Sequence, residues 1–193
     1  PATAWLIDDT SSAGAPTYTK GTSTAVLTLA STSEVENVCL HFGDALDFDI
    51  DSIIRAEFRV KVTGCTTGTE LVFDLGSARN DTADSVTANA WFRMVGATST
   101  TAVVVESDDG VTDNDDVATG ATLATVYKRF VIDFSGGTSN VKFYIDGVQV
   151  ATATTFDMSG YTAGLQPIVQ IQKAANTNVD AVTVDYIKIV SRR

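Results

Sequence analysis

The densest group of possible metal ligands in the chain is an acidic run over residues 108–116, which reads Asp-Asp-Gly-Val-Thr-Asp-Asn-Asp-Asp. Carboxylate oxygens at this density suit Ca²⁺, which takes six to eight oxygen ligands in a flexible geometry. The candidate Ca²⁺ ligands are Asp108, Asp109, Asp113 and Asp115. The run does not fit an EF-hand, because the required Gly and Glu are missing in every register. The alternative is an acidic loop that water solvates, with no cofactor in the protein.

Carboxylates that could hydrolyse a glycosidic bond are the next candidates. Many sandwich-fold hydrolases carry acid and nucleophile on one strand, as in Glu-x-Asp-x-x-Glu, so that both reach the same sugar. Glu34 and Glu36 share a strand but lack this pattern and have no neighbouring Trp. His41, the single histidine, has no Gly-x-Ser-x-Gly partner motif for nucleophilic catalysis. We therefore predict that the chain is not an enzyme.

Carbohydrate binding without catalysis needs exposed aromatic faces with amide and carboxylate hydrogen bonds. Trp5 and Trp91 lie in strand-like segments, where they either pack in the core or stack on a sugar. Tyr18, Tyr161 and the amides of residues 176–178 lie in loop-like segments and are better placed to meet a ligand. Their spacing does not choose between these alternatives.

The elements that must position these residues are strands. Apolar residues alternate with charged ones in the segment 54–62, which predicts a strand with one core face and one solvated face. Its inward set is Ile54, Ala56, Phe58, Val60 and Val62. About a dozen such strands separated by turn residues predict an all-β fold, with loops over 11–21, 107–120 and 155–167. We expect residues 1–193 to form one domain.

The last third of the chain carries a family resemblance. A strand over 127–134 is followed by a Gly-Gly turn, and the run Phe-Tyr-Ile-Asp-Gly-Val-Gln-Val ends at residue 150. Its Asp146-Gly147 pair is typical of a type I′ hairpin, and a closing strand covers 181–190. Over residues 120–190 this pattern resembles the concanavalin A-like (laminin G-like) domains. The resemblance implies an antiparallel β-sandwich of jelly-roll type, a fold that lectins, glycosidases and virus structural proteins share.

Composition excludes several classes of partner. The formal net charge is −11, from 24 acidic against 13 basic residues, which argues against binding to nucleic acid or to anionic membranes. No apolar run is long enough to span a membrane. Cys39 and Cys65 lack the spacing of a zinc site, and two buried free thiols are expected in preference to the alternative, a disulfide between them.

Two classes of function fit these observations. The N-terminal segment 1–9 does not resemble a signal peptide, and the composition is rich in Thr, Ala, Val and Gly. Both features, with the family resemblance, favour a structural protein of the kind found in tailed-bacteriophage virions. The main prediction is a capsid decoration protein, made in the host cytoplasm and attached in the virion to the major capsid protein. The alternative is a lectin-like module whose partner is a glycan.

An apolar stripe on the last strands provides a candidate interface. Val131, Ile187 and Ile189 are predicted to face outward, opposite an inward set that includes Val184 and Tyr186. Grouped exposed apolar residues usually mark an interface, although the chain's own loops are equal candidates to cover them. If the chain coats a capsid, a homotrimer is the natural stoichiometry.

Overall fold

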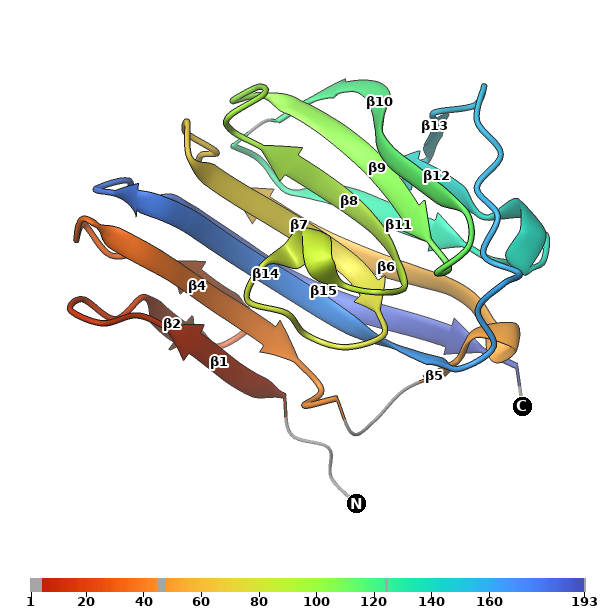
Figure 1. Cartoon of the computed structure of the whole chain (residues 1–193), viewed down its shortest axis with the longest axis horizontal. Helices are drawn as coiled ribbons and strands as arrows, with labels where there is room; N and C mark the ends of the chain where they lie inside the picture. Colours follow the sequence, from red (N-terminus) through yellow and green to blue (C-terminus); the bar gives the residue numbers. More distant parts are fainter. Residues whose placement is uncertain (1–4, 45–47, 124, 193) are drawn as a thin grey trace.

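The alternation of apolar and polar residues produces two antiparallel sheets that pack face to face. Figure 1 shows this arrangement in a computed structural model of the chain, which describes residues 5–44, 48–123 and 125–192. Every strand pair in the described residues is antiparallel. This architecture confirms the predicted β-sandwich.

The first sheet, here sheet A, has eight strands. In spatial order it contains β1 (Leu6–Thr10), β4 (Glu34–His41), β14 (Gly164–Asn176), β7 (Thr69–Gly76), β8 (Asn89–Val95), β9 (Ala102–Asp108) and β10 (Asp113–Thr122), with β5 (Phe48–Asp49) paired to β14.

The second sheet, here sheet B, has seven strands. In spatial order it contains β13 (Val148–Val150), β12 (Lys142–Ile145), β11 (Lys128–Asp133), β6 (Ile53–Val62), β15 (Ala181–Ser191), β3 (Ala25–Thr28) and β2 (Thr17–Lys20). Three short 3₁₀ turns complete the described elements: η1 (Ile50–Ser52), η2 (Ala83–Ser85) and η3 (Thr138–Asn140).

The main hydrophobic core lies between the sheets. Aromatic rings cross it in a chain, with centroid distances of 5.0 Å from Phe92 to Phe130, 5.3 Å from Phe92 to Phe143 and 4.8 Å from Phe143 to Phe156. Four of the five residues predicted to point inward from the segment 54–62 belong to this core, namely Ala56, Phe58, Val60 and Val62. Phe130, Ile132, Phe143 and Ile145 of the neighbouring strands pack in the same core. The hairpin prediction is also confirmed, because Asp146 and Gly147 both adopt positive φ, 51° and 86°.

Two orientation predictions are wrong because bulges change the alternation. On β15, Val184 pairs with Val60 but Tyr186 pairs with Arg59, so one extra residue enters the strand. Ile187 and Ile189 therefore pack against the core, and Tyr186 turns outward.

A second irregularity lies at the start of β6, where Ser191 pairs with Ile53 and Val190 with Arg55. It places Ile53 in the core and leaves Ile54 half-buried, so Ile54 was wrongly assigned to the inward set. A one-residue change of register reverses the faces of a strand, and sequence alternation alone does not locate such a change.

The segment predicted as the loop 107–120 is another correction. Most of it forms β10, which pairs with β9 and is the outermost strand of sheet A. Its residues alternate between exposed and half-buried, since an edge strand needs only one covered side. Acidic residues are therefore compatible with strand structure here.

Two further observations complete the fold. Cys39 and Cys65 are buried free thiols, and burial raises the pKa of Cys65 to about 12, so it stays protonated. Among the described residues there is no helix with the length and hydropathy needed to cross a membrane.

Candidate functional site

The outer face of sheet A, which points away from the core, is covered by a loop of the chain itself. This covering loop, residues 77–88, connects β7 to β8 and contains η2, which lies across the sheet in Figure 1. Its Ala83 and Val86 form a second buried cluster with Val72 and Trp91 of the sheet. Trp91 is therefore a packing residue, fully buried between the sheet and the loop.

Glutamine side chains on β14 hold the covering loop down. Gln170 Nε2 donates to the Asn80 carbonyl oxygen at 2.9 Å and to Gln172 Oε1 at 2.9 Å. Gln172 Oε1 also accepts from the Ala83 backbone N–H at 3.2 Å. Since buried amides must be paired, this ladder fixes the loop in one position over the sheet.

An arginine surrounded by carboxylates lies next to the loop. Five carboxylates contact Arg93, and together they are called the acidic cluster: Glu70, Asp84, Glu106, Asp115 and Asp116. Arg93 Nε donates to Glu70 Oε1 at 2.7 Å, and Nη1 lies 2.6 Å from Asp84 Oδ1. These residues come from four strands and the covering loop, so only the fold brings them together. One guanidinium cannot neutralise five carboxylates.

Burial and this excess of acid change the pKa values of the cluster. Burial raises the pKa of Glu106 to about 8, although Arg93 acts in the opposite direction. Burial and the nearby Glu106 raise the pKa of Asp74 well above its usual value. Burial lowers the pKa of Arg93, but its carboxylate partners outweigh burial and raise it overall. Burial therefore favours the protonated forms of Glu106 and Asp74.

Several buried polar atoms beside Glu106 lack hydrogen-bond partners. Asp74 is 1 % exposed, and neither of its carboxylate oxygens has a partner among the described residues. The same holds for Asn89 Oδ1, while Asn89 Nδ2 reaches toward Glu106 Oε1 at 3.4 Å. The Trp91 Nε1–H has no partner of good geometry, yet it lies close enough to Glu106 to lower its pKa. Unsatisfied buried groups are rare and call for an explanation.

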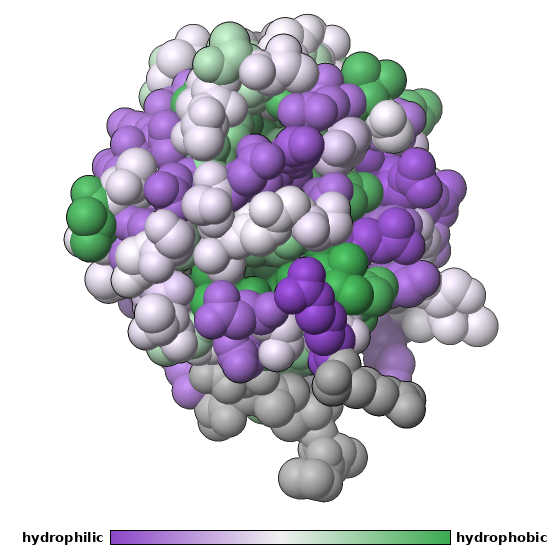
Figure 2. All heavy atoms as spheres, turned by 90° about the vertical axis from the view of Figure 1, so that its right-hand side faces the viewer, coloured by the Kyte–Doolittle hydropathy of each residue, from purple (hydrophilic) through white to green (hydrophobic). Residues whose placement is uncertain are grey.

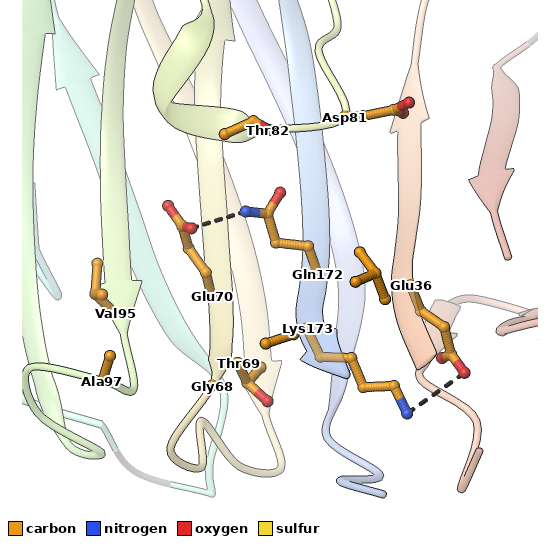
Figure 3. A pocket seen from close by; sticks show the side chains of 12 residues that line it. Glu36, Gly68, Thr69, Glu70, Asp81, Thr82, Val95, Ala97, Gln172 and Lys173 are labelled. Atoms are coloured by element: carbon orange, nitrogen blue, oxygen red, sulfur yellow. Dashed lines mark hydrogen bonds and ion pairs between the residues drawn. The ribbon is translucent and has the colours of Figure 1, made fainter. Parts of the chain in front are cut away.

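The part of the outer face that the covering loop leaves open forms a groove of about 300 Å³. Its lining side chains are drawn in Figure 3, with Glu70 and Gln172 on the floor and Asp81 and Thr82 on the loop above them. Gln172 Nε2 donates to Glu70 Oε2 at 2.8 Å. Glu70 therefore belongs both to the groove and to the acidic cluster, and burial raises its pKa. Carboxylate, amide and hydroxyl groups therefore line the groove, both on its floor and on the loop above it.

The structure does not bring the four predicted Ca²⁺ ligands together. Asp108 Oδ1 accepts from the Gly110 backbone N–H at 2.7 Å. Asp109 Oδ1 accepts from Thr112 N–H at 2.6 Å, and its Oδ2 accepts from Gly160 N–H at 2.7 Å. Asp109 therefore fastens its turn to a neighbouring segment.

Of the remaining two, Asp113 pairs with Asp108 at the end of the β9–β10 hairpin, and only Asp115 belongs to the acidic cluster. Sequence analysis missed the residues that join Asp115 there. Asp84 is 31 residues away in the covering loop, and Glu106 lies on the neighbouring strand β9. No local pattern links positions whose contact depends on the covering loop.

The glutamates and the histidine considered for catalysis have structural roles. Glu34 caps a turn by accepting from Ser12, Ala13 and Gly14, and the hydrogen bonds from Ser12 are the main reason its pKa falls to about 2. Glu36 forms a buried ion pair with Lys173. His41 is buried, and its Nδ1 accepts from the Gly43 backbone N–H at 3.1 Å.

The exposed aromatic residues lie away from the groove. Trp5 and Tyr18, both more than one-third exposed, line a shallow hollow of about 310 Å³ together with Tyr186. Of the predicted interface residues, only Val131 lies on the outer face of sheet B, where it lines a hollow with Arg129 and Tyr144. At the end of the sandwich shown in Figure 2, hydrophilic residues separate the apolar ones into small groups.

Solved structures similar to this chain include proteins that act on carbohydrate or recognise it. A glycoside hydrolase family 16 (GH16) protein of a mixed linkage glucan locus from Bacteroides ovatus aligns with a TM-score of 0.65 and 12 % identity, over 98 % of this chain and 96 % of that one. A laminarinase from Flavobacterium sp. UMI-01 aligns with a TM-score of 0.66 and 16 % identity, over 90 % and 81 %. The carbohydrate recognition domain of Emp47p aligns with a TM-score of 0.63 and 13 % identity, over 100 % and 90 %.

These similarities show the class of fold. The chain is a concanavalin A-like jelly-roll sandwich, as the sequence resemblance implied. No family model matches the sequence, and no curated protein matches it either. Identities of 12–16 % show that the fold is shared, but they do not show a shared activity.

One functional prediction is corrected by these comparisons. The prediction that the chain is not an enzyme was wrong to exclude catalysis, because similar structures of this fold include several glycoside hydrolases. That prediction considered only carboxylates on one strand. Glu70 lies on β7 and Glu106 on β9, and both form ion pairs with Arg93. The virion location, the capsid partner and self-association stay predictions.

Proposed function

We propose that the chain binds carbohydrate in the groove on the outer face of sheet A. The observation that carries this proposal is the groove itself, which combines an open floor with hydrogen-bonding groups on both sides. Sugar hydroxyls are both donors and acceptors, so they pair with carboxylate, amide and hydroxyl groups of this kind. The shared fold with a carbohydrate recognition domain and with glucan hydrolases supports the proposal.

The floor of the groove is preorganised for a ligand. Arg93 and Gln172 hold the Glu70 carboxylate at 2.7 and 2.8 Å, so its direction is fixed before a sugar arrives. The Thr82 hydroxyl and the Asp81 carboxylate at the rim are exposed, and they add groups that a sugar chain can reach. A ligand here would replace water at side chains that are already in place.

The test is calorimetric titration with oligosaccharides of mixed-linkage glucan and of laminarin, since similar structures act on glucans. The blocking variant is Ala97→Trp, because Ala97 is exposed and lines the groove without contacting the acidic cluster. We expect wild-type protein to bind at least one glucan and Ala97→Trp to lose about tenfold or more of the affinity, as a filled site must.

The matched control is Thr100→Trp, which adds the same ring at an exposed position of the same loop outside the groove. Equal affinity in both tryptophan variants would overturn the groove as the site. A loss in Tyr18→Ala together with normal binding in Ala97→Trp would move the site to the aromatic hollow.

Glycoside hydrolysis is a second candidate function. It is favoured by one observation: Glu70 faces the groove with a raised pKa, and the Asp81 carboxylate lies at the rim of the same groove. Hydrolysis of a glycosidic bond uses one protonated and one ionised carboxyl group. In this arrangement Glu70 would supply the proton to the leaving oxygen.

The release of reducing ends from the same glucans measures this activity directly. Hydrolysis by wild-type protein that Glu70→Gln abolishes, with glucan binding retained, would support the role of Glu70. Intact oligosaccharides after prolonged incubation with protein that binds them would remove hydrolysis as a function and leave the binding proposal standing.

A further inference from the structure

The outer face of sheet B is basic, although the chain as a whole is acidic. The strand residues that alternate with core positions face outward here. Among the described residues these include six of the chain's 13 basic residues, against three acidic ones, Glu57, Asp133 and Asp185. The six basic residues are Arg55, Arg59, Lys61, Arg129, Lys142 and Lys188. Positive charge is therefore concentrated on one side of a protein whose net charge is −11.

This face contains a hollow of about 380 Å³, here called the basic hollow. Its lining includes Arg55 on β6 and Arg129 on β11, with Val131 and Tyr144 in the row between them. Arg55 pairs with Asp133, four residues along β11 from Arg129, so at about 3.4 Å per residue the two arginine positions are about 14 Å apart. Each end of the hollow therefore has a cation, and its middle has an aromatic ring and an aliphatic side chain.

The two arginines of the basic hollow have no acidic partner. Arg55 and Arg129 are exposed, and neither guanidinium forms an ion pair or a hydrogen bond among the described residues. Arg59, by comparison, pairs with Asp185 and lies 4.6 Å from the centre of the Tyr127 ring. In a chain with 24 acidic residues against 13 basic ones, a guanidinium without a carboxylate is available to an external anion.

The two carboxylates that line the basic hollow are bonded to other groups. Asp133 Oδ1 accepts from the Ser135 backbone N–H at 2.8 Å. Glu57 is 7 % exposed and accepts from the Tyr186 hydroxyl. Neither carboxylate lies within ion-pair distance of an arginine of the hollow. The charged groups of the hollow that lack a partner are therefore positive.

We propose that the basic hollow binds an acidic glycan, a sugar chain that carries carboxylate or sulfate groups. The planar guanidinium presents pairs of N–H donors that match paired anionic oxygens. Between the arginines, the Tyr144 ring and Val131 offer an apolar surface to the C–H face of a sugar. The choice of a sugar chain as the carrier of the anion rests on the proposed carbohydrate binding, whereas the anion site rests on the two arginines.

The negative net charge does not oppose this ligand as it opposes nucleic acid. Exposed charges are screened over about 8 Å at physiological ionic strength. The sheets of a sandwich pack about 10 Å apart, so the acidic cluster on the outer face of sheet A lies beyond this distance. Duplex nucleic acid carries one charge per about 1.7 Å and would also meet the acidic remainder of the surface. A sugar chain with widely spaced anionic groups needs to contact only the basic face.

Calorimetric titration with acidic oligosaccharides tests the site. Oligogalacturonate supplies carboxylates and sulfated dextran oligosaccharides supply sulfates, while methyl-esterified oligogalacturonate and unsulfated dextran oligosaccharides are the neutral counterparts. We expect wild-type protein to bind at least one acidic glycan about tenfold or more tightly than its neutral counterpart. Arg55→Gln and Arg129→Gln should each lower that affinity about tenfold, because each removes hydrogen bonds between charged groups.

The matched control is Lys20→Gln, which removes one exposed positive charge outside the basic hollow. Unchanged affinity in both arginine variants, an equal loss in Lys20→Gln, or no binding of either acidic glycan would overturn the site. Light scattering tests a second copy of the chain as the occupant. A mass that rises with concentration in the wild type but not in Arg129→Gln, without glycan binding, would overturn the glycan proposal.

Two cross-tests separate this site from the groove on sheet A. Ala97→Trp should bind the acidic glycan as the wild type does, and the double variant Arg55→Gln/Arg129→Gln should keep the wild-type affinity for neutral glucan. Loss of the acidic glycan in Ala97→Trp would place that ligand in the groove and contradict the proposal. Binding of neutral glucan alone would overturn only the basic hollow. Binding of the acidic glycan alone, lost in the double variant, would support the hollow and overturn only the groove.

Discussion

The outer faces of the two sheets use charged residues in opposite ways. On sheet B, partly exposed charged residues pair across neighbouring strands, as Arg59 does with Asp185. On sheet A, Arg93 is 7 % exposed, carries five carboxylate contacts and lies beside a loop that covers the face. Exposed pairs contribute little to stability, whereas a buried charge without its partner is costly. The outer face of sheet B is thus largely solvated, whereas the outer face of sheet A contains buried charged groups beside the covering loop.

The largest difference is expected between the two arginines. Arg93→Ala should lower the free energy of unfolding by about 3–5 kcal/mol, because it leaves buried carboxylates without a counter-charge. Arg59→Ala should cost less than about 1 kcal/mol, since its ion pair is solvent-screened. Urea denaturation of both variants measures the difference. Equal losses would show that the two faces do not differ in this way.

A smaller effect concerns which face of β15 is covered. Ile187→Ala should cost about 1–2 kcal/mol, less than the roughly 2–5 kcal/mol of a fully buried residue, because Ile187 is half-buried against the core. Lys188→Ala, on the opposite side of the same strand, should cost less than about 0.5 kcal/mol. Denaturation midpoints compare the pair. A larger loss in Lys188→Ala than in Ile187→Ala would show that the bulge at Asp185 is wrongly assigned.

The third effect is a pH dependence that arises from Asp74 on sheet A. The pKa of Asp74 is raised in the folded protein, so its stabilising contribution is complete below the unfolded pKa of about 4. That contribution is lost as pH rises toward the folded pKa, with a slope of at most about 1.4 kcal/mol per pH unit. Asp74→Asn should remove this part of the decline. Unfolding measured from pH 4 upward provides the check, and identical pH profiles of the two proteins would contradict it.

The same comparison explains how much the sequence could predict. On sheet B most of β6 alternates between core and solvent, so its inward positions from Ala56 onward and the Asp146-Gly147 hairpin were readable in advance. On sheet A the covering loop buries the outer face as well as the core face. Outer-face residues such as Asp74 and Trp91 are therefore buried, and polar residues do not alternate regularly with apolar ones. The groove and the acidic cluster were therefore not predictable from spacing.

Two other features resist prediction for physical reasons. An added residue at Asp185 reverses the orientation of Ile187, and nothing in the local composition marks it. The contact of Asp84 with Asp115 depends on the path of a loop between two distant strands. Local patterns specify strands, whereas the candidate site is made of contacts between residues far apart in the chain.

The position of β10 at the edge of sheet A has a consequence for behaviour in concentrated solution. An outermost strand presents unpaired backbone groups to which another chain can add, the first step of cross-β aggregation. The exposed Asp113, Asp115 and Asp116 make such addition repulsive while they are ionised. Acidification toward the isoelectric point of about 4.3 would remove both this local repulsion and the net charge that keeps molecules apart. The carboxylates of β10 therefore oppose fibre growth at neutral pH, and this protection is lost in acid.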